Sequence, residues 1–247
     1  MFLTTRGLVL RYAKYKESDA ILTVLTEHEG KITVHARGAK AKASRYKAAV
    51  QHLVFSEMTL FGNRGRWSLN EAETLEQFIG LRADLRALAL ASYFAELLEA
   101  LSDEDSPNVD ILRLGLNALY ALSNDYAPQE LIKAVTELRI LCLGGYEPQL
   151  EQCAFCGKTD IVKPRFSAAE ASVLCADCVP NARGEILELC EGSLSAMRHA
   201  VHSDMKKMYS FSLEAQAQAR LSRAAESHVF IWLERSFGTL DYWKRLT

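Results

Sequence analysis

The stretch "GKITVHARGAKAKASRYK" (residues 30–47) combines the pattern of a β-strand with a run of positive charge. Ile32, Val34 and Ala36 alternate with polar residues, which is the period-two pattern of a strand with one apolar face. Small residues and more cations follow the strand, and the whole stretch lacks an acidic residue. The sequence therefore predicts a strand that runs into a basic loop. The cations of the stretch are Lys31, Arg37, Lys40, Lys42, Arg45 and Lys47.

Four more strand-like segments surround this one in the first third of the chain. They are short runs rich in β-branched, aromatic and other apolar residues, separated by turn signals such as Gly30. Five short strands within about 80 residues favour a closed or nearly closed barrel, and an OB-type fold is the leading candidate. The four additional predicted strands are 8–12, 20–26, 53–61 and 66–70.

Charge is distributed unevenly along the chain, although the net charge is only −2. Residues 1–69 contain 12 Lys and Arg against 5 Asp and Glu, whereas the remainder contains 17 against 26. A basic first part favours a polyanionic partner whose phosphates it neutralises, and the alternative is a solvated charged face. Aromatic residues beside the basic loop would either stack on bases or pack in the core. They are Tyr12, Tyr15, Tyr46 and Trp67.

From about residue 81 the apolar residues recur with the period of a helix. Leu90, Phe94 and Leu97 belong to one such stripe, and further stripes follow near residues 112–119 and 131–142. Two later segments, 186–200 and 213–236, continue the pattern. The remainder of the chain is therefore predicted to be a helical bundle.

Two C-x-x-C pairs interrupt the helical part. Eighteen residues separate the pairs, which is the spacing of a four-thiolate zinc site. The segment between them is too polar to form a core of its own, so a metal ion would order it. Free thiols, a redox pair and disulfides are the alternatives. Four sulfur ligands leave no open position, which makes a structural rather than a catalytic zinc the prediction. The predicted ligands are Cys153, Cys156, Cys175 and Cys178.

The composition excludes several classes of protein. The chain has no run of about 18 apolar residues and no secretory signal, so we expect a cytoplasmic protein without a membrane partner. It shows no P-loop, nucleophile elbow or H-E-x-x-H motif, so we expect neither an enzyme nor a small-molecule substrate. Glu17 and Asp19 are interpreted as turn residues rather than as metal ligands of a nuclease.

Two segments carry a resemblance to a known family. "GLVLRYAKYKESDAILTVLTEHEGKITVHARGAKAKASRY" (7–46) and "LRILCLGGYEPQLEQCAFCG" (138–157) resemble the RecO family of bacterial recombination mediators. The first has a first-strand Gly, an E-x-D step, a hairpin and an R-G-A run into a basic loop. The second has a helix that ends in a Gly-Tyr-x-Pro turn and leads to the zinc knuckle.

The resemblance implies an α+β fold with an N-terminal five-stranded OB-type β-barrel, a helical bundle and an inserted four-cysteine zinc module. The expected parts are 1–80 for the DNA-binding barrel, 81–150 and 183–247 for the helical domain, and 151–182 for the zinc module. It also implies binding of single- and double-stranded DNA, annealing of complementary strands, and replacement of single-stranded DNA-binding protein by RecA with the help of RecR. Such a protein would associate with the nucleoid.

A zinc-ribbon scaffold that binds RNA or protein without annealing strands is the alternative to this function.

The resemblance also assigns residues to the roles in DNA repair. Lys133 and Arg139 are expected to pair with the acidic tail of single-stranded DNA-binding protein. The expected DNA-binding residues are Arg11, Lys31, Arg37, Lys40, Lys42, Arg45, Lys47, Arg64 and Arg66.

Overall fold

The structure is a computed structural model that describes residues 1–63, 66–104 and 106–246. By its internal packing the chain divides into two compact units. Unit 1 comprises Met1–Asn124 and Phe237–Thr247, and unit 2 comprises Asp125–Ser236. The predicted domain limits after residues 80, 150 and 182 stay predictions.

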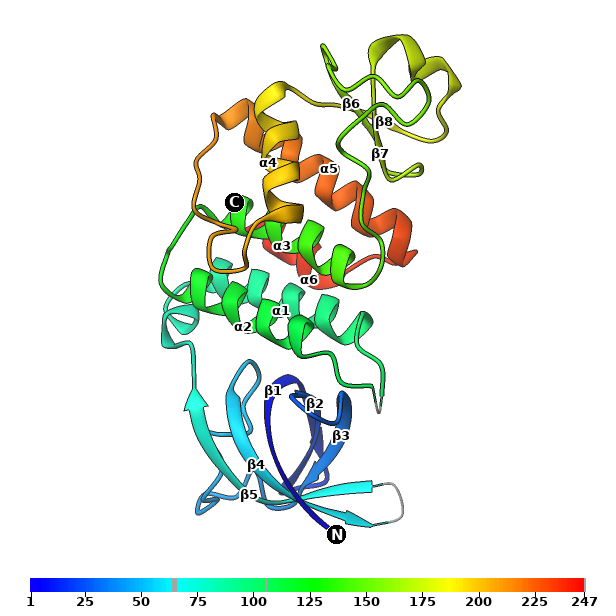
Figure 1. Ribbon diagram of the computed structural model, residues 1–247. Coiled ribbons are helices and arrows are strands. Elements are labelled where there is room, and N and C mark those ends of the chain that lie inside the picture. The colour runs from blue at the N-terminus through cyan, green and yellow to red at the C-terminus, as the bar shows by residue number, and fades with distance from the viewer. Residues whose placement is uncertain (64–65, 105, 247) are drawn as a thin grey trace. The chain divides into compact units, whose positions relative to one another are not determined.

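Unit 1 contains a closed five-stranded barrel (Figure 1). Around the barrel the strands follow the order β1-β2-β3-β5-β4, and a parallel pairing of β3 with β5 closes it between otherwise antiparallel neighbours. The predicted fold class, a five-stranded barrel followed by helices and a cysteine cluster, is confirmed. The strands are β1 (Phe2–Tyr15), β2 (Asp19–Thr26), β3 (Lys31–Ala36), β4 (Phe55–Asn63) and β5 (Arg66–Glu76).

The first strand is longer than the predicted segment 8–12 because it serves two partners. Its first half pairs with β4 and its second half with β2, and a bulge lies between Val9 and Arg11. Gly7 takes part in both pairings. A Cβ on Gly7 would lie 2.5 Å from Val24 Cγ1, so this crossing point leaves no room for a side chain.

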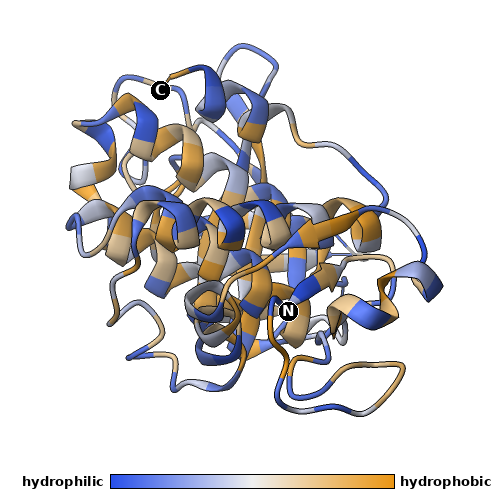
Figure 2. Ribbon diagram, turned by 90° about the horizontal axis from the view of Figure 1, so that it is seen from above, coloured by the Kyte–Doolittle hydropathy of each residue, from blue (hydrophilic) through white to orange (hydrophobic). Residues whose placement is uncertain are grey.

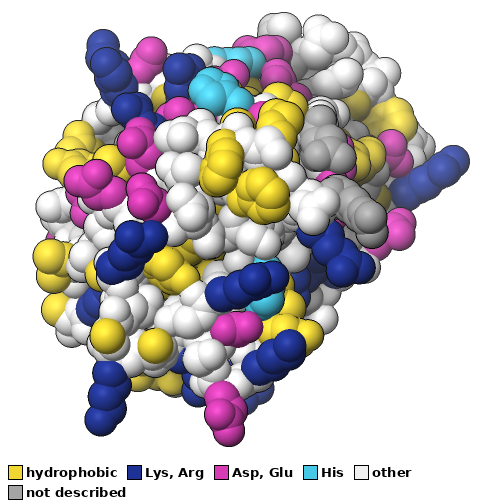
Figure 3. All heavy atoms as spheres, turned by 90° about the horizontal axis from the view of Figure 1, so that it is seen from below, with side chains coloured by type: hydrophobic (Ala, Val, Ile, Leu, Met, Phe, Trp, Pro, Cys, Tyr) yellow, Lys and Arg dark blue, Asp and Glu magenta, His cyan; other side chains and the backbone are white. Residues whose placement is uncertain are grey.

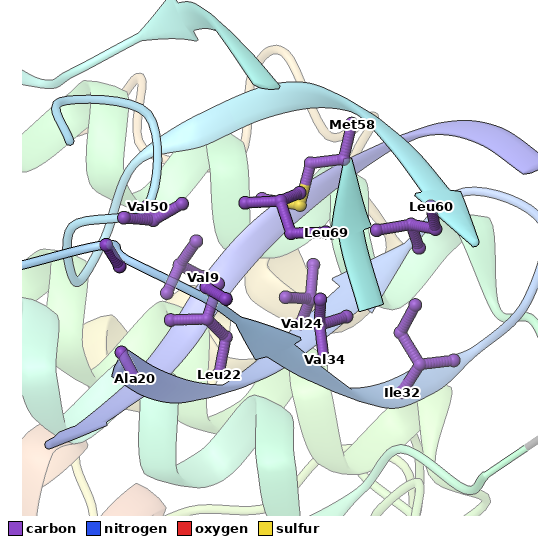
Figure 4. Close-up of a cluster of buried hydrophobic side chains, with 12 residues drawn as sticks. Val9, Ala20, Leu22, Val24, Ile32, Val34, Val50, Met58, Leu60 and Leu69 are labelled. Atoms are coloured by element: carbon purple, nitrogen blue, oxygen red, sulfur yellow. The ribbon is translucent and has the colours of Figure 1, made fainter. Parts of the chain in front are cut away.

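The barrel interior is filled by the apolar faces of the strands (Figure 4). β-Branched residues such as Val9, Val24 and Val34 are fully buried, as expected for side chains that pack well on a pleated surface. Met58 and Leu60 of β4 point into the same cluster. This core fixes the barrel as a rigid support for the loops at its ends.

Three helices and a short 3-10 turn complete unit 1. They are η1 (Ile79–Arg82), α1 (Leu85–Ala100), α2 (Val109–Ser123) and α6 (Gly238–Arg245), and α1 packs against both α2 and α6. Asp84 caps α1 by accepting a hydrogen bond from the backbone N–H of Arg86 (2.8 Å). The Arg86 guanidinium lies 4.5 Å from the Trp243 ring centroid, and Tyr93 meets Phe237 at 5.2 Å. The α6 helix was not predicted, since eight residues carry too little periodicity.

Unit 2 contains the remaining helices and a small sheet. Its elements are α3 (Gln129–Leu143), β6 (Arg165–Ser167), β7 (Ser172–Leu174), η2 (Ala176–Asn181), β8 (Ile186–Glu188), α4 (Glu191–His202) and α5 (Ala215–Leu233). The α3 helix packs against both α4 and α5, and ten of its 15 residues are buried. Figure 2 shows the mixture of apolar and polar residues along the helical ribbons. None of the helices in the described parts of the chain combines the length and apolar character needed to cross a bilayer.

A helix was predicted from residue 186, but β8 occupies Ile186–Glu188 and α4 begins only at Glu191. The other two short strands, β6 and β7, were not predicted, because three residues each are too few to show a period. Their buried residues pack against α5. The Phe166 ring lies 5.7 Å from that of His228, and Trp232 Nε1 donates a hydrogen bond to the Ala168 carbonyl (2.9 Å). The segment is thus ordered partly by this helix and partly by the cysteine cluster.

Candidate nucleic-acid interface and metal centre

The basic loop is residues 37–54, which connect β3 to β4. Ala39, Ala49 and Val50 are buried, so one side of the loop packs on the barrel. Gly38 begins the loop at φ +66°, a conformation that residues with a Cβ rarely adopt. The loop therefore has a defined shape with its apolar residues turned inward.

Asp19 fixes the start of the basic loop. Its carboxylate accepts hydrogen bonds from the Gly38 backbone N–H (2.9 Å) and the Ser18 hydroxyl (3.2 Å), and its other oxygen lies 3.1 Å from His35 Nε2. The Gly38 N–H is the main reason why the pKa of Asp19 lies below its usual 3.8. A lowered pKa means that the anchor persists above pH 4 and is lost only as the pH falls through the folded-state value. The Lys40 backbone N–H also donates to the Ser18 carbonyl (2.9 Å).

Most cations of the basic loop project into solvent. Arg37, Lys42, Arg45 and Lys47 are exposed, and Lys40 is half-buried with its ammonium 3.2 Å from the Lys16 carbonyl. Arg45 lies 3.6 Å from Glu71, but both side chains are more than half exposed, so the pair holds the guanidinium only weakly. On the face shown in Figure 3, Lys and Arg side chains are spread over the surface with Asp and Glu among them.

Of the other predicted DNA-binding residues, the structure describes Arg11, Lys31 and Arg66, which lie elsewhere on the barrel. Arg11 forms an ion pair with Glu99 of α1 (3.2 Å), and the Lys31 ammonium donates to the Glu99 carbonyl (2.8 Å). Both cations are therefore engaged by the helix. Arg66 is exposed at the start of β5, and Arg64 lies outside the described residues.

Two cations of the β1–β2 hairpin, Lys14 and Lys16, were not assigned to DNA from the sequence, yet the structure places them near the basic loop together with Tyr15, which the sequence had offered for base stacking. Lys14, Tyr15 and Lys16 are exposed at the hairpin, and Lys40 bonds to the backbone of Lys16. Their alternation of cation and ring in "YAKYK" (12–16) was the signal that could have identified them.

The four cysteines of the two C-x-x-C pairs come together in unit 2. Their Sγ atoms all lie within 4.8 Å of one another, and Cys156 Sγ is 3.8 Å from Cys175 Sγ. In a tetrahedron with metal–sulfur distances of about 2.3 Å, the sulfurs are about 3.8 Å apart. Leu174 is buried with Cys153 and Cys175, Ile161 and Ile186 pack against this cluster, and Cys156 is exposed. The donor set and spacing fit a closed four-thiolate metal centre.

Local contacts favour the thiolate that a metal ion requires at Cys153 but disfavour it at Cys178. Burial alone would raise the pKa of Cys153, but backbone N–H groups, chiefly that of Cys175, lower it to about 6. Hydrogen bonds from the neighbouring sulfurs, chiefly Cys175, raise the pKa of Cys178 to about 12. Four crowded sulfurs cannot all ionise without a cation, since like charges repel.

Comparison with known families identifies the chain. The family model described as "Recombination protein O N terminal" matches residues 1–78, and the one described as "Recombination protein O C terminal" matches residues 82–240. The chain belongs to the RecO family.

Relatives in the RecO family match the chain along its length. A "DNA repair protein RecO" from Acetivibrio thermocellus is 31% identical over 99% of this chain and 97% of its own length. One from Alkaliphilus metalliredigens is 28% identical over the whole of both chains. Another from Desulforudis audaxviator is 40% identical over 70% of this chain and 69% of its own.

The structure corrects one residue expected from the RecO resemblance to meet a partner. Lys133 is fully buried, with its ammonium 3.0 Å from Glu137 and 2.9 Å from Glu226. It is already paired inside unit 2 and is not available at the surface. Arg139 is half-buried and donates to the backbone carbonyls of Ala200 and Val201. Sequence periodicity placed both residues on a helix but did not reveal what covers that helix.

Proposed function

We propose that the chain is a recombination mediator in DNA repair. It binds single- and double-stranded DNA, anneals complementary strands, and acts with RecR to replace single-stranded DNA-binding protein by RecA. The exposed basic loop, fixed to a closed barrel in a RecO-family chain, is the observation that carries the proposal. The family's role in repair and recombination comes from the names of its models and relatives.

The proposed mechanism requires no bond-making step. Lysine and arginine side chains of the basic loop neutralise phosphates and release condensed counterions, which favours binding of either strand. Once their charge is reduced, two strands approach closely enough for base pairing to select the complement. The barrel contributes by holding the cations in place, since Asp19 and Ser18 fix where the loop begins.

Annealing of complementary oligonucleotides coated with single-stranded DNA-binding protein tests this function. With the chain present we expect duplex to form much faster than in its absence. In a reaction that contains RecA, adding the chain together with RecR should increase the amount of RecA loaded on the DNA. A chain that binds DNA yet leaves the annealing rate unchanged would contradict the proposal and favour the scaffold alternative. Labelled DNA that is cleaved in the presence of Mg²⁺ would instead indicate an enzyme.

We also propose that the four-cysteine centre holds Zn²⁺. Cys153, Cys156, Cys175 and Cys178 would be its ligands, and the ion would neutralise the thiolates and join the two C-x-x-C segments. A full set of sulfur ligands leaves no position for water, so the role would be structural.

Native mass spectrometry checks the metal directly. The wild-type chain is expected to carry one zinc ion, and the variant with Cys153→Ser and Cys175→Ser is expected to carry none, because two remaining thiolates hold zinc poorly. Cys142→Ser is the matched control, since that cysteine lies outside the cluster, and it should keep the metal. A metal-free wild type that melts at the same temperature as the zinc-loaded one would contradict a structural role.

A further inference from the structure

Of the four aromatic residues that the sequence offered for base stacking, three are used by the barrel itself. Tyr12, Tyr46 and Trp67 are partly buried and pack against the barrel core. The Tyr46 hydroxyl also donates to the Arg37 carbonyl. Tyr15 differs, because it is 42% exposed at the end of β1 and does not belong to that cluster.

Tyr15 is held in place from one side by neighbouring strands. Its ring lies 5.6 Å from the His35 ring, and the two planes meet at 83°. A perpendicular contact of this kind covers at most one face of Tyr15, and the exposed, flexible Lys16 side chain lies over the ring, where a flat ligand would take its place. His35 Nε2 in turn lies 3.1 Å from the Asp19 carboxylate. Asp19 therefore links the support of Tyr15 to the start of the basic loop.

One cation contacts this ring, and a second contacts the backbone of the residue that follows it. The Lys16 ammonium lies 5.4 Å from the Tyr15 ring centroid, and the Lys40 ammonium bonds to the backbone of Lys16. An exposed ring with flexible ammonium groups near it matches the requirements of a single-stranded nucleic acid, in which unpaired bases stack and the flanking phosphates need positive charge.

We propose that Tyr15 stacks on an unpaired base and so contributes to the affinity of the chain for single-stranded DNA, with His35 and Asp19 as positioning residues. This inference rests on the proposed function and adds to it a way to distinguish single from double strands. Stacking needs a free base face, and a duplex hides its base faces within the stack. The basic loop, in contrast, acts on the phosphates of either form.

A competing platform is present at the other end of β1. Phe2 and Phe61 are also exposed, and their rings lie 5.3 Å apart. Phe2 lies at the start of β1 with Phe61 opposite it on β4, whereas Tyr15 and the turn that anchors the basic loop lie at the end of β1. The position beside the loop cations therefore favours Tyr15, and the phenylalanine pair becomes an arm of the test.

The experiment compares binding of a thymine oligonucleotide, the same backbone with abasic sites, and a blunt duplex. Tyr15→Ala is expected to weaken binding to the thymine strand by roughly 5- to 100-fold, and to leave binding to the abasic strand and the duplex unchanged. The salt dependence should also be unchanged, because no charge is removed. Tyr15→Phe keeps the ring and should restore binding, and Tyr120→Ala removes another exposed tyrosine as the matched control.

A photocrosslink locates the contact directly. An oligonucleotide with one 5-iodouracil should crosslink to Tyr15, and His35→Ala should lower that yield without changing the salt dependence. If Tyr15→Ala binds the thymine strand normally, or if the variant with Phe2→Ala and Phe61→Ala loses the binding instead, the stacking proposal is overturned. If the variant with alanines in the basic loop keeps the wild-type salt dependence, the proposed DNA site itself is overturned. That result can be distinguished from a failure of the stacking proposal.

Discussion

The variant with Lys40, Lys42, Arg45 and Lys47 all changed to alanine is expected to bind single-stranded DNA about 100- to 1,000-fold more weakly near 0.1 M salt. Each lost phosphate contact lowers the slope of log affinity against log salt by about 0.7. Four contacts therefore lower it by about 3. The reason is entropic, since fewer cations release fewer counterions. Fluorescence anisotropy with a labelled oligonucleotide over a range of salt concentrations measures both the affinity and the slope.

A charge-matched control separates this local effect from the net charge of the molecule. The variant with Arg113, Lys206, Lys207 and Arg223 changed to alanine also loses four exposed cations, all of them outside the barrel. It should keep the wild-type slope. Equal slopes for the wild type and the basic-loop variant would show that DNA binds elsewhere on the chain, and the basic-loop site would have to be abandoned.

The second large effect concerns the buried ionic group of unit 2, in which Lys133 lies between Glu137 and Glu226. Lys133→Met is expected to destabilise the protein by about 3–5 kcal/mol, because it leaves carboxylates buried without their cation. At roughly 2–4 °C per kcal/mol for a chain of this size, the melting temperature should fall by roughly 10 °C. Differential scanning calorimetry measures the change.

The pH dependence of this contribution has a definite sign. Burial alone would lower the pKa of Lys133, but Glu137 and Glu226 together raise it above its ordinary 10.5. A raised lysine pKa gives stability that is fully present below about pH 10 and is lost as the pH rises through the folded-state value. The difference between Lys133→Met and wild type should therefore not fade between pH 7 and 9.

Two comparisons make the interpretation specific. Arg223→Ala breaks an exposed ion pair with Glu185 and should cost less than about 1 kcal/mol. Adding Glu137→Gln and Glu226→Gln to Lys133→Met removes the two carboxylate charges that Lys133 no longer balances, so it should recover part of the lost stability. A Lys133→Met protein that melts like wild type would mean that the ammonium contributes no net stability.

The barrel and the long helices were predictable because their signals are local. The alternation around Val34 predicts β3, and the leucine stripe from Leu90 predicts α1. Paired C-x-x-C spacing likewise predicts the meeting of four sulfurs, which the structure shows. The elements that were missed are short, namely β6, β7, β8 and α6. Each is too brief to show a period, and its ordering depends on contacts with distant segments.

The environment of each individual cation was much less predictable from the sequence. Whether a lysine meets solvent or a carboxylate depends on residues far away in the sequence, as with Lys31 and the Glu99 carbonyl, or Lys133 and Glu226. The partner of the anion Asp19 was equally hard to predict from the sequence. The sequence indicated a turn residue, but only the fold shows that its carboxylate reaches the backbone of Gly38. Charge runs therefore predict a candidate region better than they predict which member is free.

The return of α6 to unit 1 bears on how the protein is made in the cell. Residues 237–246 are synthesised after all of unit 2, yet they pack against α1, which left the ribosome well over a hundred residues earlier. The part of α1 that contacts Phe237 and Trp243 therefore lacks these partners until residues 237–246 have been synthesised. A nascent chain stalled before this point would expose that part of α1 to chaperones, although its barrel strands were already complete.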